Sequence, residues 1–316
     1  MRSRSWSASK ARRSKSPGLN SFVASFVLPA LAPAVLVGVL LAVSWRAWTR
    51  DVPERGQGPG GAWLGALAFA GAHAVGHVLL RDGLPAAPWS DRVLSAQAWL
   101  FWIVLAAGLV ATFEATRRAG SLAVWCVRLP LAVATIALVL RVKLTRTWEG
   151  GEAALYGGGL FLWMVAAWEG ISRAGRRPGP ALPIVMVLAI SGLAVATGLS
   201  GSAFLAQLAG ATAAGFGAAA VVAWRARRVT LDGGAVSVAW VALFGIGLCA
   251  TFFNELPGTS ALAFAAVPLA LGLAELPAVA RRPLAAGLVR YGLTLALVTI
   301  GTGLAVAAYE PDPYGY

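Results

Sequence analysis

Ten apolar runs divide the sequence, and each is close to the length that a helix needs to cross a bilayer. About 20 residues of α-helix span the hydrocarbon core, which is about 30 Å thick. Peptide groups in lipid must bond to one another, and no alternation of period two suggests barrel strands, so helices are expected. The runs cover residues 21–45, 62–80, 94–114, 121–140, 152–172, 182–199, 203–224, 235–254, 259–279 and 284–308.

The composition excludes an ordinary soluble domain. Of the 316 residues, 58% are apolar and 12% are charged, and the mean hydropathy is +0.73. A soluble domain carries about a quarter charged residues, so lipid must cover the remaining surface. We therefore predict an all-α, polytopic integral membrane helix bundle of about ten apolar helices, with nine or ten full crossings.

Three segments follow from this pattern. Residues 1–20 contain basic and serine residues and no acidic residue, which predicts a disordered basic tail on the cytoplasmic side that could bind anionic lipid headgroups. Residues 21–309 form the transmembrane domain, and residues 310–316 form a short acidic C-terminal tail. The lipid bilayer is the expected partner, and a bacterial-type cytoplasmic (inner) membrane is the expected location. Protein partners stay unknown.

The net charge of +13 does not indicate nucleic-acid binding, because the basic residues lie between the apolar runs and form no stripe on one face. They carry topological information instead. Strict alternation of ten crossings places 11 Lys and Arg on the side of the tail and 13 on the other side, which is no bias.

Two alternatives restore a bias, and the sequence does not choose between them. In the first, the run at 152–172 is broken at Gly157, Gly158 and Gly159, which gives 19 against 5. In the second, the run at 62–80 does not cross, which gives 16 against 8. The side of the C-terminus therefore stays open. Paired arginines mark four of the connections, at Arg117/Arg118, Arg176/Arg177, Arg227/Arg228 and Arg281/Arg282.

Two of these arginine pairs begin similar stretches. Residues 117–136 and 281–300 each contain the arginine pair and then a Val-Arg step, at Arg128 and Arg290. A glutamate precedes each stretch, Glu114 and Glu275. The pattern is consistent with an internal repeat, as in many transporters, but coincidence at membrane margins is the preferred interpretation.

His73 and His77 are the first candidate polar site. Their i, i+4 spacing places them on one face of a helix, beside the small residues Ala68, Ala72 and Gly76. They could make interhelical hydrogen bonds, relay protons, or bind a metal together with a carboxylate from another helix. No cofactor is otherwise indicated.

Charged residues within or near the runs form the second set of candidates. An isolated charge in the bilayer is costly, so Arg128 and Arg290 should face a partner or reach back to the headgroups. Asn254 and Glu255 precede Pro257, and Glu275 precedes Pro277, so a broken helix end with a carboxylate could coordinate a cation or proton. The candidate intramembrane site therefore comprises His73, His77, Asn254, Glu255, Glu275, Arg128 and Arg290.

The aromatic residues suggest no ligand by themselves. Tryptophans near run ends, such as Trp148, Trp168 and Trp224, fit the headgroup level, and other Trp, Phe and Leu residues are expected to face lipid. Cys126 and Cys249 each lie within an apolar run and form no disulfide framework. No Ser/His/Asp set or paired catalytic carboxylates occur, which argues against an enzyme.

Three functions remain open. The preferred one is a permease-like carrier for a small solute, the second is a non-catalytic membrane scaffold or assembly subunit, and the third is a metal or redox enzyme that uses the His pair. The number and length of the runs resemble the plan of several small permease families, including the drug/metabolite transporters. This resemblance is one of size, and no motif residue carries it.

Overall fold

The structure is a computed structural model, and it describes residues 27–50, 62–90, 94–116, 121–226, 229–231 and 234–309. The expected tails, 1–20 and 310–316, lie outside the described residues. Within those ranges every regular element is a helix, so the predicted all-α class is confirmed.

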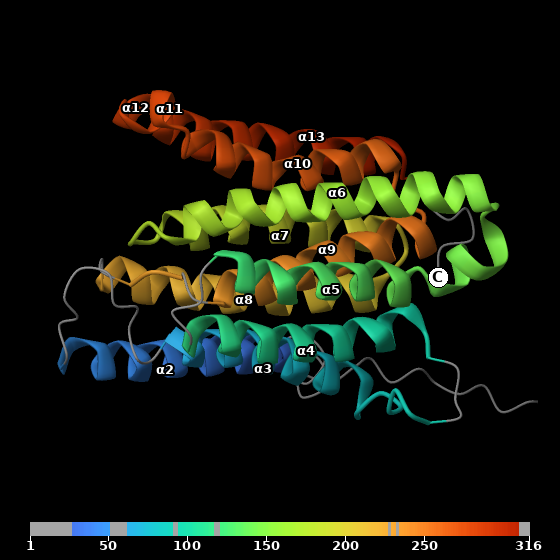
Figure 1. Ribbon diagram of the computed structural model, residues 1–316, viewed down its shortest axis with the longest axis horizontal. Helices are drawn as coiled ribbons and strands as arrows, with labels where there is room; N and C mark the ends of the chain where they lie inside the picture. The colour runs from blue at the N-terminus through green and yellow to red at the C-terminus, as the bar shows by residue number, and fades with distance from the viewer. Residues whose placement is uncertain are drawn as a thin grey trace, which may run out of the picture.

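Ten long or medium helices form the bundle, joined by short connections (Figure 1). Two π-helical segments, η2 and η3, and two short helices, α11 and α12, complete the described part. The elements are α2 (Leu28–Arg50), α3 (Ala62–Arg81), α4 (Ala96–Thr116), α5 (Ser121–Val139), η2 (Lys143–Thr147), α6 (Gly150–Gly175), α7 (Ala181–Leu199), α8 (Ala203–Arg225), α9 (Ala235–Phe253), α10 (Gly258–Ala274), α11 (Pro277–Ala280), α12 (Pro283–Gly287), η3 (Leu288–Leu293) and α13 (Thr294–Ala307).

Eight of the described helical segments are long and apolar enough to cross a bilayer, which gives the chain the architecture of a polytopic integral membrane protein. Leu28–Ser44 in α2 and Gly258–Ala274 in α10 are apolar but shorter. The expectation of about ten spans is therefore met in part.

The proposed break at the glycine triplet is wrong. Helix α6 runs without interruption through Gly157, Gly158 and Gly159 for 26 residues. A Cβ atom at Gly158 or Gly159 would meet no atom within 4 Å, so the glycines lie in open surroundings in an intact helix. Helix α3 is also continuous over 20 residues and is one of the eight candidate spans, so neither alternative to a full crossing finds support.

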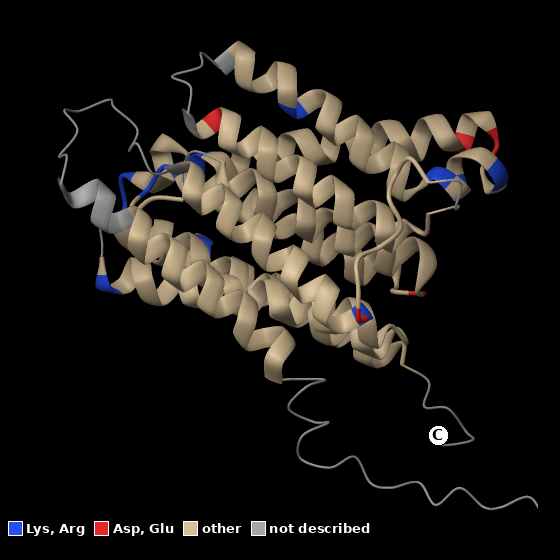
Figure 2. Cartoon of the chain, turned by 90° about the horizontal axis from the view of Figure 1, so that it is seen from below, with Lys and Arg blue, Asp and Glu red and all other residues tan. Residues whose placement is uncertain are grey.

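Consecutive long helices run in opposite directions, so α4, α6, α8 and α10 all finish at one end of the bundle (Figure 1). We call this the arginine end, because the connections with the four arginine pairs all follow these helices. Arg117/Arg118 and Arg227/Arg228 themselves lie outside the described residues. The charged residues of the described part gather towards the two ends, and the middle of the bundle is almost uncharged in this view (Figure 2).

Helix α9 is the centre of the bundle. It packs against α3, α4, α6 and α10, and 78% of its apolar stretch is buried inside the protein. Small residues allow close packing between other helices, as sequence patterns of this kind predict. Gly170 of α6, for example, lies so near α10 that a Cβ atom there would be 2.8 Å from the carbonyl oxygen of Pro268.

Two breaks in the helices coincide with the predicted proline positions. The first separates α9 from α10 at residues 254–257, where Glu255 has a positive φ of 59°. The second follows α10 at Glu275, after which the chain forms α11, α12 and the π-helical segment η3 before α13 begins. π-Helical turns are rare and often mark functional or strained positions.

Candidate functional site

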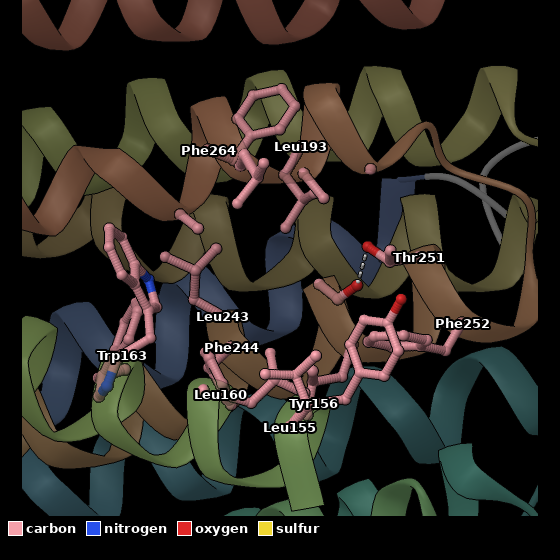
Figure 3. A pocket seen from close by; sticks show the side chains of 18 residues that line it. Leu155, Tyr156, Leu160, Trp163, Leu193, Leu243, Phe244, Thr251, Phe252 and Phe264 are labelled. Carbon is pink, nitrogen blue, oxygen red and sulfur yellow. Dashed lines mark hydrogen bonds between the residues drawn. The ribbon is translucent and has the colours of Figure 1, made fainter. Parts of the chain in front are cut away.

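A cavity of about 540 Å³ lies between α6, α7, α9 and α10. Figure 3 shows aromatic and aliphatic side chains from these helices around it. Its volume falls within the range of roughly 300–1,000 Å³ that is usual for small-molecule sites. The cavity is lined by Leu155, Tyr156, Gly159, Leu160, Trp163, Leu193, Trp240, Leu243, Phe244, Gly247, Leu248, Thr251, Phe252, Gly258, Ala261, Leu262, Phe264 and Ala265.

Few polar side chains line this cavity, and two of them are bonded within the protein. The hydroxyl of Thr251 donates to the carbonyl oxygen of Gly247 at 2.9 Å (Figure 3), and the indole N–H of Trp240 donates to the carbonyl oxygen of Met164 at 3.0 Å. The indole nitrogen of Trp163 is buried and has no partner among the described residues. The cavity therefore offers contact area to an apolar group and little to a strongly polar one.

The cavity opens on the lateral surface of the bundle, between α6 and α10. Leu155 and Leu262, on the first halves of these two helices, line the cavity and are nevertheless 73% and 67% exposed. Tyr156 beside them is 46% exposed. In a membrane protein this apolar surface faces the hydrocarbon, so a molecule can enter from the bilayer.

The open space follows from the residues on the facing helices. Gly247 of α9 and Gly159 of α6 both line the cavity, and a Cβ atom at either position would meet nothing within 4 Å. Nearer the arginine end the same two helices close together, because the position of a Cβ atom at Gly175 lies only 2.6 Å from the side chain of Val236. The helices therefore diverge from a tight contact to an unfilled space.

A buried ion pair lies in that closed part. Arg128 of α5 donates from Nε and Nη2 to the two carboxylate oxygens of Glu114 on α4, both at 2.9 Å. Its Nη1 donates to the hydroxyl of Ser172 on α6 at 3.1 Å. This two-point geometry is the strong form of an arginine–carboxylate contact.

Helix α9 completes this network. The hydroxyl of Ser237 donates to Glu114 Oε2 at 3.0 Å, and the indole N–H of Trp168 donates to the same hydroxyl at 3.1 Å. The guanidinium of Arg128 also lies 5.5 and 5.4 Å from the ring centroids of Trp125 and Trp168. We call Glu114, Arg128, Trp168, Ser172 and Ser237 the Glu114 network. Its charges and hydroxyls satisfy one another, so it holds four helices together.

One residue of this network departs from the sequence-based expectation, and another meets one of its two alternatives. Trp168, expected at the headgroup level, is fully buried and bonded within the bundle. Arg128 has the expected partner rather than a path to the headgroups, since its side chain is only 10% exposed.

A second ion pair lies at the same end of the bundle. Arg290, in η3, donates to Glu275 at 2.7 Å, and Arg177, just after α6, pairs with the other oxygen of Glu275. Each of the two stretches with the arginine-pair and Val-Arg pattern therefore contains an arginine that is paired with the preceding glutamate. The first pair joins α4 to α5, and the second joins the end of α10 to η3, which leads into α13. The carboxylate of Glu275 is already neutralised by two guanidinium groups, which leaves it little capacity for a further cation.

His73 and His77 lie elsewhere, on the faces of α3 that meet α4 and α8. Their side chains are buried, and none of their four ring nitrogens has a hydrogen-bond partner among the described residues. The ring of His77 lies between Phe101 and Phe204, with centroids 4.9 and 5.2 Å away. The expected close packing is present, because a Cβ atom at Gly76 would lie 3.1 Å from Ala211. Interhelical hydrogen bonds, one of the three alternatives for this pair, are not made to any described residue.

Among the described residues, no carboxylate lies beside the histidines to complete a metal site. Within the described ranges, no group of three or more His, Cys, Asp and Glu residues is placed to hold a metal ion. Asn254 and Glu255 lie on the connection after α9: the Asn254 amide donates to the carbonyl oxygen of Cys249 at 2.9 Å, and Glu255 is exposed. The candidate residues are thus distributed over separate places, and none of them lines the cavity.

Sequence reasoning missed the cavity because it assigned Trp, Phe and Leu residues to lipid by default. That assignment is wrong for Trp163, Trp240, Phe244 and Phe264, which line the cavity. The available signal was the mixture of large aromatic residues with Gly159 and Gly247 on two runs. It becomes informative only when the two helices are known to face one another.

Comparison with known proteins gives no relative of this chain. No family model, no curated protein and no solved structure matches it. The functional argument therefore depends on the geometry alone.

Proposed function

We propose that the protein is a permease-like carrier for a small solute, and that the solute places an apolar part in the cavity between α6, α9 and α10. The observation that carries this proposal is the cavity itself, with about 540 Å³ of space and an almost wholly apolar lining. The His pair, which the enzyme hypothesis requires, lies away from this cavity.

The way into the cavity supports a solute that arrives through the membrane. Leu155 and Leu262 are exposed at the opening, so the path leads from the bilayer. The aromatic walls provide large contact areas in fixed positions, as is usual for small-molecule sites.

We further propose ten crossings in a bacterial-type cytoplasmic membrane, with the N-terminal tail on the cytoplasmic side. Strict alternation gives 11 and 13 basic residues on the two sides, and the first helix with its tail usually dominates orientation. This places the arginine end on the outer side. Labelling of single cysteines at Arg176 and at Arg146 in intact cells distinguishes the two orientations, because only the outer one reacts with an impermeant reagent.

Binding to the cavity is the first experiment. The probe is methyl parinarate, an uncharged polyene chain that receives energy from nearby tryptophans such as Trp163 and Trp240. We expect saturable energy transfer in the wild type and its loss in Gly247→Leu, where the added side chain occupies the cavity. Gly217→Leu is the matched control, since Gly217 on α8 also has no atom within 4 Å of its Cβ position and lies outside the cavity lining.

Transport is the second experiment. Proteoliposomes should move amphiphiles between leaflets faster than empty liposomes, and Gly247→Leu should abolish the difference while Gly217→Leu retains it. Equal binding by the wild type and Gly247→Leu, or equal movement in both kinds of vesicle, contradicts the proposed function.

A further inference from the structure

The charges beside the cavity suggest which class of solute it accepts. This inference rests on the proposed function. An uncharged hydrocarbon dissolves in the bilayer and crosses it unaided, whereas a charged group in the hydrocarbon core costs several kcal/mol. A carrier with an apolar cavity is therefore useful for a solute that combines a hydrocarbon chain with a charged end, and the protein must receive that end near the cavity.

We propose that the solute is an anionic amphiphile, with its hydrocarbon chain in the cavity and a phosphate or carboxylate headgroup at the basic turn. We define the basic turn as Arg141, Lys143 and Arg146, which lie in or next to η2 between α5 and α6. The turn lies at the end of the bundle opposite the arginine end (Figure 1).

Three contacts place the basic turn over one end of the cavity. Trp148, which follows η2, stacks on the cavity residue Tyr156 with ring centroids 4.9 Å apart. The same indole meets the edge of Phe252, another cavity residue, at 5.3 Å. The side chain of Leu144 in η2 lies 4.0 Å from the Cβ position of Gly157 on α6. The turn and the cavity are therefore parts of one packed unit.

The cations of the basic turn are free to meet an anion. Arg141 and Arg146 are exposed and Lys143 is half-buried, and none of the three makes an ion pair with a described residue. The ammonium group of Lys143 lies 6.0 Å from the ring centroid of Phe253, at the end of α9. One arginine or lysine near the membrane surface typically raises the affinity for an anionic headgroup by about tenfold or less.

Three exposed carboxylates lie at the same end as the basic turn. Glu149 and Glu152 form a capping box at the start of α6, in which the backbone N–H of Glu149 donates to Glu152 Oε2 at 3.4 Å and the Glu149 side chain accepts from the N3 backbone. These two carboxylates are therefore directed to the helix terminus. Glu255 is exposed on the connection between α9 and α10. None of these three carboxylates makes an ion pair with a described residue, so the basic turn attracts an anion through its own local contacts and not through a net positive charge at this end.

The depth of the aromatic residues agrees with this arrangement. Trp148 and Tyr156 stack between the basic turn above and the apolar cavity, as amphipathic rings do at the level of lipid headgroups. A chain that extends from the cavity past these rings brings its headgroup to the turn. The site therefore recognises both parts of an amphiphile.

Competition among amphiphiles of one chain length tests the inference. Methyl parinarate is bound to the full-length protein in neutral detergent and displaced by dodecyl phosphate, dodecanoate or dodecanol. We expect the better anion to displace the probe at a concentration about tenfold or more below that of dodecanol. Which anion is better identifies the headgroup as phosphate or carboxylate.

The matched variant is Lys143→Gln/Arg146→Gln, which removes two charges outside the cavity lining. It should bind methyl parinarate and respond to dodecanol like the wild type, and its preference for the anions should fall to about threefold or less. Equal displacement by dodecanol and both anions in the wild type overturns the inference, as does an undiminished preference in the variant. If methyl parinarate itself does not bind, the proposed function fails instead, so the two failures are distinguishable.

Discussion

Helices α6 and α9 take part in two regions with opposite properties. Near the arginine end, Trp168 and Ser172 of α6 and Ser237 of α9 belong to the Glu114 network, in which charged and hydroxyl groups are bonded to one another. Further along the same helices, Trp163 of α6 and Gly247 of α9 line an apolar cavity. The first region is polar and closed, and the second is apolar and open.

This difference shows why polarity alone is a poor guide to the site in a membrane bundle. Buried charges are costly in lipid, so those that occur must be neutralised, and full neutralisation leaves no group for a ligand. An apolar cavity loses only packing contacts, which a ligand can restore. We therefore expect changes in the Glu114 network to reduce stability and changes in the cavity to reduce binding.

The largest expected effect is that of Arg128→Met. It leaves Glu114 buried without its charge partner, which should lower the free energy of unfolding by about 3–5 kcal/mol. Denaturation in mixed detergent, followed by helical circular dichroism, measures it. Arg173→Met is the control: its ion pair with Glu169 is an i, i+4 contact with the arginine 53% exposed, so its loss should cost about 0.5 kcal/mol or less. Similar losses in the two variants would remove the distinction between buried and exposed pairs.

The double variant Glu114→Leu/Arg128→Met sharpens this test. With both charges gone no buried charge remains unpaired, and we expect the double variant to be more stable than Arg128→Met by about 2 kcal/mol. The same denaturation experiment gives the result. Additive losses would show that each side chain contributes separately and that the network is not a unit.

Removal of one hydrogen bond from the network should have a smaller effect. Trp168→Phe keeps most of the buried ring and removes the N–H that donates to Ser237, which should cost about 1 kcal/mol. Methyl parinarate binding should not change, because Trp168 does not line the cavity. A stable variant that has lost binding would contradict the separation of the two regions.

A substitution in the cavity should leave stability nearly unchanged and reduce binding. Gly247→Leu fills open space in a helix, so the free energy of unfolding should stay within about 1 kcal/mol of the wild-type value or rise by that amount. The thermal unfolding midpoint measures this. A loss as large as that of Arg128→Met would mean that the cavity position tolerates no side chain, and the binding results of this variant would then report misfolding.

The sequence predicts the fold class well, because the solvent argument needs only composition and run length. It also identifies the breaks before Pro257 and Pro277, since proline removes a helix hydrogen bond and favours a helix end, although Pro130 and Pro268 lie inside α5 and α10. The paired pattern at Glu114/Arg128 and Glu275/Arg290 marked both ion pairs without showing that they form. Pairing is a property of facing helices, and a single sequence does not specify which helices face.

The errors of the sequence-based predictions also have physical causes. A glycine triplet permits a break but does not require one, and α6 stays helical because in lipid an unpaired peptide group is costlier than a flexible helix. An aromatic residue facing lipid and one facing an internal cavity have similar surroundings, so Trp163 and Phe264 carry no distinguishing signal in the sequence. The cavity is visible only in three dimensions.

The most direct test of the central claim is to locate a hydrocarbon chain in the protein. Crystals grown with bromododecane and measured at the bromine absorption edge reveal the bromine atom by its anomalous scattering. The account predicts a bromine peak in the space bounded by Trp163, Phe244 and Phe264 in the wild type, and its disappearance in Gly247→Leu crystals. Bromine found in the wild type only on the outer surface of the bundle, with the same peaks in the variant, would contradict it.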